Sequence, residues 1–228
     1  MPGSFIRLSY VTILCANVLL MLGTLLSDLG VTVPWGFGQF DLKLEGNFAT
    51  WYSSGLLLLA AGAALLISMR PASGSRPLFL YRMAWTATSL VLLALSVDEM
   101  NELHERVGIW FTDRFGPISG LTEGGSGIYG WLVALLPFVA AFIVGMGAMI
   151  RSWLRVNRLS RNLAVAALAC WIGVLGAEFT EAQLARLSMY RSVEGVFEEG
   201  LEIMGTALFL ASFCEFLRSQ KRPEDERL

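Results

Sequence analysis

Long apolar runs separated by short polar stretches dominate the pattern of hydrophobicity along this chain of 228 residues. A run of about twenty apolar residues is long enough to cross the hydrocarbon core of a bilayer as a helix. The pattern therefore predicts an all-α integral membrane protein, a bundle of about six transmembrane helices forming one polytopic domain over residues 1–228. The predicted spans are roughly 8–28, 51–69, 79–101, 129–150, 162–182 and 196–217.

Composition strengthens this prediction and excludes other classes. The chain is 55% hydrophobic and only 16% charged, with a mean hydropathy of +0.59, whereas soluble domains carry about a quarter charged residues. Cys15, Cys170 and Cys214 fall inside apolar runs without metal-ligand spacing, so they are interpreted as small buried residues. No basic patch with interleaved aromatic residues occurs, and we expect no nucleic-acid partner.

The distribution of basic residues predicts the orientation. If the N-terminus is cytoplasmic, twelve of the seventeen basic residues fall on the cytoplasmic side and five on the other. This bias follows the positive-inside rule and predicts that both termini are cytoplasmic. Arginine-rich, lysine-poor usage and short loops indicate the inner (plasma) membrane of a bacterium, with the opposite side facing the periplasm.

Acidic residues gather where three of the predicted spans meet the outer side. Asp98, Glu178 and Glu202 each lie sixteen or seventeen residues from a cytoplasmic arginine of the same span, about 24–26 Å at the rise of a helix. All three are therefore predicted at one depth, just inside the outer edge of a core about 30 Å thick. Ionisable groups at this depth need a partner, a wet cavity or a bound ion.

A divalent-metal site built from carboxylates on three helices is the first interpretation of this cluster. The predicted ligands are the acidic residues nearest that depth: Asp98, Glu99, Glu102, Glu178, Glu181, Glu198, Glu199 and Glu202. Possible additional ligands are the single histidine and two further acids: His104, Glu105 and Glu45. The alternative is an ion-pair network, in which arginines on the same side neutralise the acids: Arg106, Arg186 and Arg191.

Oxygen ligands favour Ca²⁺, Mg²⁺ or Mn²⁺ over Fe or Zn. Di-iron sites in helix bundles use two Glu-x-x-His elements, and this chain has one histidine and no such element. No catalytic residue can be assigned, because nucleophile-elbow, His-Glu-x-x-His and P-loop patterns are missing from the sequence.

Three functions remain open at this point. The first is a metal-dependent enzyme whose outward-facing site acts on a lipid or lipid-linked substrate. The second is a non-catalytic accessory subunit of a larger membrane complex, in which the acidic cluster is structural. The third is a cation transporter or sensor. The bilayer is the expected partner in every case, and other membrane subunits are expected in the second.

Two further features carry structural expectations. Trp85, Trp131 and Trp153 are predicted to belong to aromatic belts at the membrane interfaces. The Gly145/Gly147 pair is predicted to mark close packing between helices.

Overall fold

The computed structural model describes residues 3–28, 37–42, 44, 46–71, 78–117, 130–184 and 190–220, with side chains over 11–27, 38–42, 44, 46–71, 78–117, 130–180 and 195–220. The regular structure within these ranges is helical. The α-helices are α1 (Gly3–Asp28), α2 (Phe48–Ser68), α3 (Leu78–Asn101), α4 (Leu103–Phe115), α5 (Trp131–Ala134), α6 (Leu136–Ser152), α7 (Arg158–Leu184) and α8 (Tyr190–Ser219). The 3₁₀ turns whose bounds lie within the described residues, η1 (Phe37–Phe40) and η3 (Leu154–Val156), accompany them.

Five helical segments within the described ranges are long and apolar enough to cross a membrane. They are Phe48–Ser68, Leu78–Asn101, Leu136–Val156, Arg158–Thr180 and Gly195–Ser219. A shorter apolar stretch, Val11–Ser27, belongs to α1. The predicted all-α membrane bundle is confirmed, and each predicted span corresponds to one of these segments.

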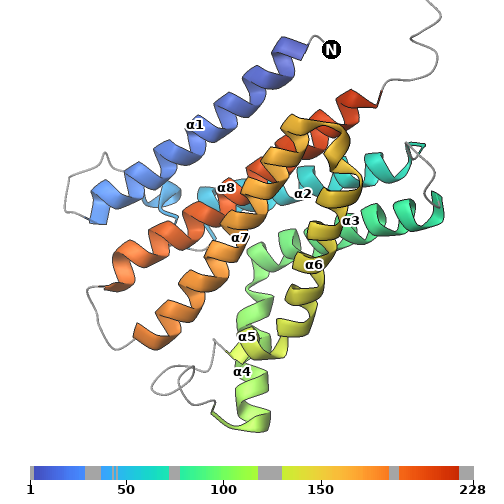
Figure 1. Cartoon of the computed structure of the whole chain (residues 1–228). Helices are drawn as coiled ribbons and strands as arrows, with labels where there is room; N and C mark the ends of the chain where they lie inside the picture. The colour runs from blue at the N-terminus through green and yellow to red at the C-terminus, as the bar shows by residue number, and fades with distance from the viewer. Residues whose placement is uncertain are drawn as a thin grey trace, which may run out of the picture.

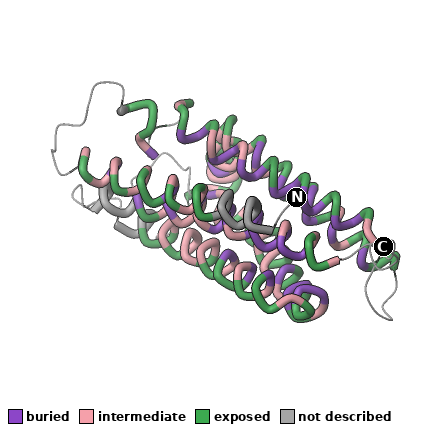
Figure 2. The backbone as a smooth tube through the Cα atoms, turned by 90° about the horizontal axis from the view of Figure 1, so that it is seen from above, coloured by how far each residue is buried: buried purple, intermediate pink, exposed green. Residues whose placement is uncertain are grey.

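Helix α8 is the centre of the bundle. It packs against α7, α2 and α1, and Figure 1 shows it running between them. Within the apolar window of α8, 67% of the residues are buried, against 11% in α7. Buried positions in Figure 2 form stripes that face the neighbouring helices, while the outer faces are exposed. Apolar side chains on those outer faces are the surface expected of helices in contact with lipid.

Reciprocal serine contacts join two antiparallel helix pairs. Ser54 on α2 and Ser96 on α3 each donate to the other's backbone carbonyl, at 2.8 and 2.9 Å. Ser160 on α7 and Ser212 on α8 do the same, at 2.8 Å in both directions. Because serine is small, the two backbones can approach closely. Its hydroxyl group donates a hydrogen bond to the partner helix, so no polar group is left unpaired in an apolar environment.

Glycine permits two close approaches to α8. A Cβ at Gly205 would collide with the ring of Trp171 on α7, and one at Gly200 would collide with Met21 on α1. By contrast, a Cβ at Gly145 or Gly147 would meet nothing within 4 Å. The prediction that this pair on α6 marks close helix packing is therefore wrong.

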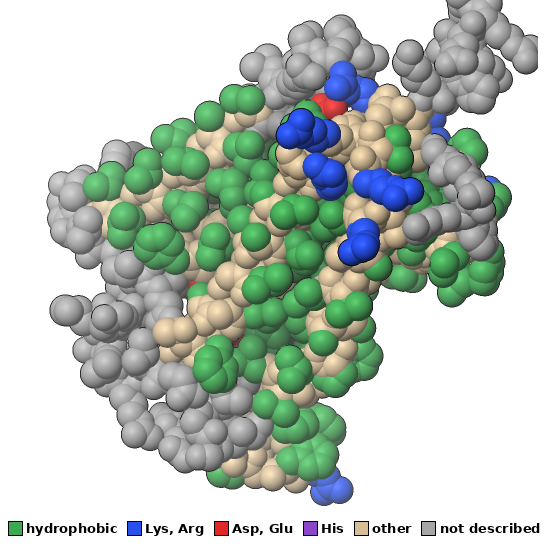
Figure 3. Space-filling view, in the orientation of Figure 1, with side chains coloured by type: hydrophobic (Ala, Val, Ile, Leu, Met, Phe, Trp, Pro, Cys, Tyr) green, Lys and Arg blue, Asp and Glu red, His purple; other side chains and the backbone are tan. Residues whose placement is uncertain are grey.

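The end of the bundle where α6 joins α7 has arginine side chains on its surface and aromatic side chains in its interior. Figure 3 shows arginine side chains gathered there, and Arg151, Arg155 and Arg158 are exposed. We call this the basic end. Beneath it, Trp85 is fully buried and Trp153 is 8% exposed. These two rings belong to the protein core and not to the predicted interfacial belt.

The predicted span 129–150 is interrupted. Helix α5 ends at Ala134, and α6 begins at Leu136, with Pro137 in its first turn. Proline lacks an amide hydrogen and its ring clashes with the carbonyl four residues earlier, so a helix cannot run straight through it. The first turn of a new helix accepts proline without loss, and the chain restarts there.

Candidate functional site

A large cavity lies between α3 and α6 and extends to α7 and α8. Its volume is about 1300 Å³, above the roughly 300–1000 Å³ usual for small-molecule pockets. It runs from Leu80 and Trp153 at the basic end to Asp98 and His104 at the other. Leu80 and Phe138 line it and are 54% and 73% exposed, so the cavity is partly open and these apolar side chains are accessible.

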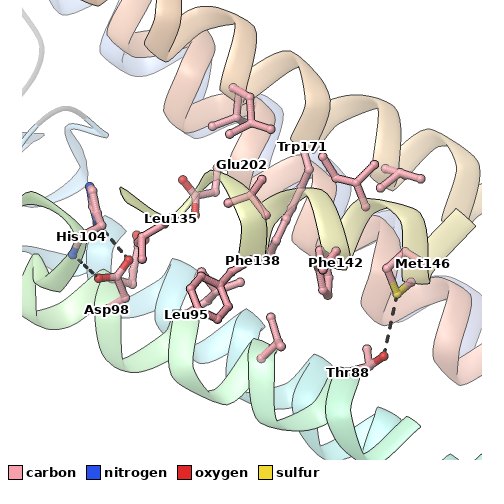
Figure 4. Close-up of a pocket in the computed structure, with 18 of the residues that line it drawn as sticks. Thr88, Leu95, Asp98, His104, Leu135, Phe138, Phe142, Met146, Trp171 and Glu202 are labelled. Atoms are coloured by element: carbon pink, nitrogen blue, oxygen red, sulfur yellow. Dashed lines mark hydrogen bonds and ion pairs between the residues drawn. The ribbon is translucent and has the colours of Figure 1, made fainter. Parts of the chain in front are cut away.

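Acidic side chains from separate helices line the end of the cavity that is remote from the basic end (Figure 4). We call this the acidic end. Its ionisable residues are Asp98, Glu99, Glu102, His104, Glu105, Glu178, Glu198, Glu199 and Glu202. Their side chains interact electrostatically: the carboxylate of Glu202 on α8 experiences the charges of Glu99, Glu178 and Asp98. Three membrane-crossing helices and α4 therefore contribute to one negatively charged region.

Asp98 and His104 form the best-defined contact of this region. Oδ1 of Asp98 accepts a hydrogen bond from the backbone amide of His104 at 2.7 Å, and Oδ2 lies 2.9 Å from the ring Nδ1 (Figure 4). The first contact satisfies an amide at the start of α4 that has no partner within the helix. The second fixes the orientation of the imidazole ring, which also contacts the ring of Trp131 edge to face, with ring centroids 5.4 Å apart.

The charge state of His104 follows from its surroundings. Burial lowers the pKa of the imidazole, but the hydrogen bond and charge of Asp98 act in the opposite direction. Glu178 and Glu105 add to their effect, and the pKa is raised overall above its usual value. Negative charges therefore stabilise the imidazolium form.

Glu102 creates the bend that brings α4 over the cavity. Its backbone is left-handed, with φ 52° and ψ 40°, between the end of α3 and the start of α4. A residue with a Cβ adopts this conformation at a cost of about 1–2 kcal/mol, and such positions concentrate at functional sites. Because of this bend, residues after Asn101 do not continue the face of α3.

Most of the sequence-predicted site residues come together in the structure. Of the predicted metal ligands, all but Glu181 line the cavity, as do the additional candidates His104 and Glu105. The side chain of Glu181 and the whole of Glu45 lie outside the described residues. Among the described residues, no group of three or more His, Cys, Asp or Glu side chains is positioned to hold a metal ion.

The predicted charge partners are placed less completely. Arg106 is exposed on α4 and does not line the cavity. Arg186 and the side chain of Arg191 lie outside the described residues. The described part of the cavity wall contains neither lysine nor arginine.

The apolar part of the cavity was not predicted from the sequence. Ala84, Ala87 and Val91 on α3 and Gly145 and Ala148 on α6 line it. A signal was present, because small residues recur at helical spacing in both spans. That pattern usually indicates close packing of two helices, and only the structure shows that these faces of α3 and α6 border a cavity.

The geometry can hold an amphipathic molecule. Its charged end would meet carboxylates, and its apolar end would lie among aliphatic and aromatic side chains. No match to the chain is found among curated proteins or among solved structures. A family model matches residues 10–216, and the chain therefore belongs to the family described as Domain of unknown function (DUF8692).

Proposed function

We propose that this protein is a membrane enzyme of the bacterial inner membrane that binds a divalent cation at the acidic end and acts on a lipid or lipid-linked substrate held in the cavity. One observation carries the proposal. Carboxylates from α3, α7 and α8 line the same cavity as apolar side chains of the membrane-crossing helices α3 and α6. A structural clasp or a blind cation site would not require both surfaces in one cavity.

The pairing of Asp98 with His104 supports a histidine ligand. Histidines that bind metals usually donate one ring N–H to a carboxylate, which orients the other nitrogen toward the metal. The carboxylate of Asp98 contacts both the backbone amide and the ring Nδ1 of His104 within hydrogen-bond distance. We therefore assign Asp98 an orienting role and infer that Nε2 of His104, once it has lost its proton, would bind the ion together with Glu178 and Glu202.

Mutual repulsion supplies the driving force for binding a cation. Glu202 lies near the charges of Glu99, Glu178 and Asp98, and like charges in a poorly solvated region repel strongly. A divalent ion held by these carboxylates would offset that repulsion. The ion would polarise a carbonyl or phosphoryl group or activate water, and a neighbouring glutamate would accept the proton.

Metal analysis tests the cation site. Protein purified in a maltoside detergent is dialysed against each candidate ion and analysed by mass spectrometry of the elements. We expect about one ion per chain, lost in the double variant Glu178→Gln/Glu202→Gln. Asp113→Asn is the matched control, because Asp113 is an exposed acid of α4 that does not line the cavity. Equal metal content in wild type and double variant would exclude the site.

Lipid analysis tests the enzymatic step. The protein is incubated with total bacterial lipid in mixed micelles, with and without EDTA, and the lipids are compared by mass spectrometry. We expect one lipid class to decrease and a product to appear only without the chelator. The double variant should leave that class unchanged. A protein that binds metal but changes no lipid would instead support the accessory-subunit or sensor interpretation.

A further inference from the structure

We propose that the occupant of the cavity is a single-chain amphiphile with a positively charged head group, the head at the acidic end and the chain along α3 and α6. This inference rests on the proposed function, because it names the substrate class of the same site. Three independent features lead to it: the small residues of the wall, the length of the cavity and the charge of its end.

The apolar wall has the shape of a groove. Ala84, Ala87 and Val91 recur at three- and four-residue spacing on α3, as do Ala141, Gly145 and Ala148 on α6. Residues at this spacing lie on one face of a helix. A Cβ added at Gly145 meets nothing within 4 Å, so this face of α6 borders open space and not another helix.

The length of the groove suits one extended chain. Leu80 and Asp98, both in the lining of the cavity, are eighteen residues apart on α3, which is about 27 Å. An extended hydrocarbon chain advances about 1.3 Å per carbon, as single bonds of ~1.5 Å require. The groove therefore accommodates roughly twenty carbons, more than the ~15 Å depth of one leaflet holds.

The charge of the acidic end selects the head group. Apart from the Asp98–His104 pair, Glu99, Glu102, Glu105 and Glu202 line this end. One divalent ion offsets two negative charges and leaves the region acidic. In the described part of the cavity wall, no lysine or arginine offsets the remaining negative charge. The ligand that complements this charge is therefore a cation. The ring of Trp131 beside His104 adds an aromatic face, which favours an ammonium group.

Alkylamines of increasing chain length are the probe. The purified protein in maltoside micelles receives primary alkylamines from about eight to about twenty carbons, and its apparent unfolding temperature is measured. Alkyl alcohols of equal length are the neutral controls. We expect stabilisation by the amines to increase with chain length up to the full groove, and to exceed that by the matched alcohols. Equal stabilisation by amines and alcohols overturns the assignment of a cationic head group.

Two sets of variants separate the head from the chain. Ala87→Phe places a ring in the groove eleven residues from Asp98, and should shorten the longest effective chain from roughly twenty to roughly twelve carbons. Ala94→Phe is the matched control, because Ala94 is exposed on α3 but does not line the cavity. Glu99→Gln/Glu202→Gln should abolish the preference for amines and keep the dependence on chain length.

The results distinguish this inference from the proposed function. If Ala87→Phe does not fold, Ala148→Phe blocks the groove from α6 and carries the same expectation, because Thr88, next to Ala87, contacts Met146 and Met149 on either side of Ala148. A length profile unchanged by the blocking variant overturns the placement of the chain. Metal content is measured on the same preparations. Metal binding without any preference for amines overturns this inference alone, whereas amine binding without metal overturns the cation site alone.

Discussion

The carboxylate of Asp98 holds His104 at two points, the backbone amide at 2.7 Å and the ring Nδ1 at 2.9 Å. Asp98 belongs to the last turn of α3, and His104 to the first turn of α4. The contact therefore fastens α4 to the end of α3 and orients the imidazole at the acidic end of the cavity. A single side chain both caps a helix and positions a candidate ligand.

This pair predicts a pH dependence of stability in the metal-free protein. The pKa of His104 is lowered by burial but raised more by Asp98, Glu178 and Glu105, so the folded protein binds the proton more tightly than the unfolded chain. The resulting stabilisation is complete below the unfolded pKa of about 6.5 and is lost as pH rises through the higher folded pKa.

Unfolding temperatures measured from pH 6 to pH 9 in EDTA check this expectation. The wild type should lose stability as pH rises across the folded pKa of His104, and Asp98→Asn should flatten that decline. His104→Gln, which has no ionisable ring, should flatten it as well. A decline that persists unchanged in both variants would assign the pH dependence to other groups.

The membrane spans could be predicted from the sequence because their signal is local. Helices such as α2 and α3 begin and end within a few residues of the apolar runs, since backbone groups in lipid must bond within their own helix. The break before α6 was missed although Pro137 was visible. Proline is compatible with a kink within the span or with the first turn of a new helix, and the sequence pattern does not separate the two.

The acidic end was predictable for a similar reason, and the groove was not. Counting residues from an arginine at the opposite end of each span predicted that Asp98, Glu178 and Glu202 lie at one depth, and all three line one cavity. Small residues at helical spacing are found both where two helices are in contact and where a helix lines a cavity. Choosing between them requires the distance between α3 and α6, which depends on how both helices pack elsewhere.

The left-handed backbone of Glu102 predicts that glycine is accepted there. Glu102→Gly should leave the protein as stable as the wild type or up to about 1 kcal/mol more stable, because glycine adopts φ 52° without strain. Glu105→Gly is the control: inside α4, glycine should cost about 1 kcal/mol. Chemical unfolding gives the free energy of unfolding of both variants and of the wild type. A destabilised Glu102→Gly would show that contacts of the Glu102 side chain stabilise the protein by more than the backbone strain costs.

The reciprocal serine contacts predict energetic coupling between paired helices. A double-mutant cycle of Ser54→Ala and Ser96→Ala should give a coupling energy of about 0.6 kcal/mol, the average for hydrogen bonds between membrane helices. Ser68→Ala is the control, because Ser68 bonds to Leu65 of its own helix. Purely additive losses at Ser54 and Ser96 would mean that each hydroxyl finds another partner when its neighbour is removed.

Contact between Gly205 and Trp171 predicts a strict limit on side-chain size in α8. A Cβ at Gly205 collides with the indole ring, so Gly205→Ala should destabilise the protein by about 1–3 kcal/mol through overpacking. Gly145→Ala adds the same methyl group in open space and should be neutral or stabilising, since alanine favours helix by about 1 kcal/mol over glycine. The second-site change Trp171→Leu should recover part of the loss in Gly205→Ala, because a smaller side chain leaves room for the methyl group. Unfolding of the four proteins in denaturant measures each difference, and equal effects of the two glycine changes would contradict the close approach of α7 and α8.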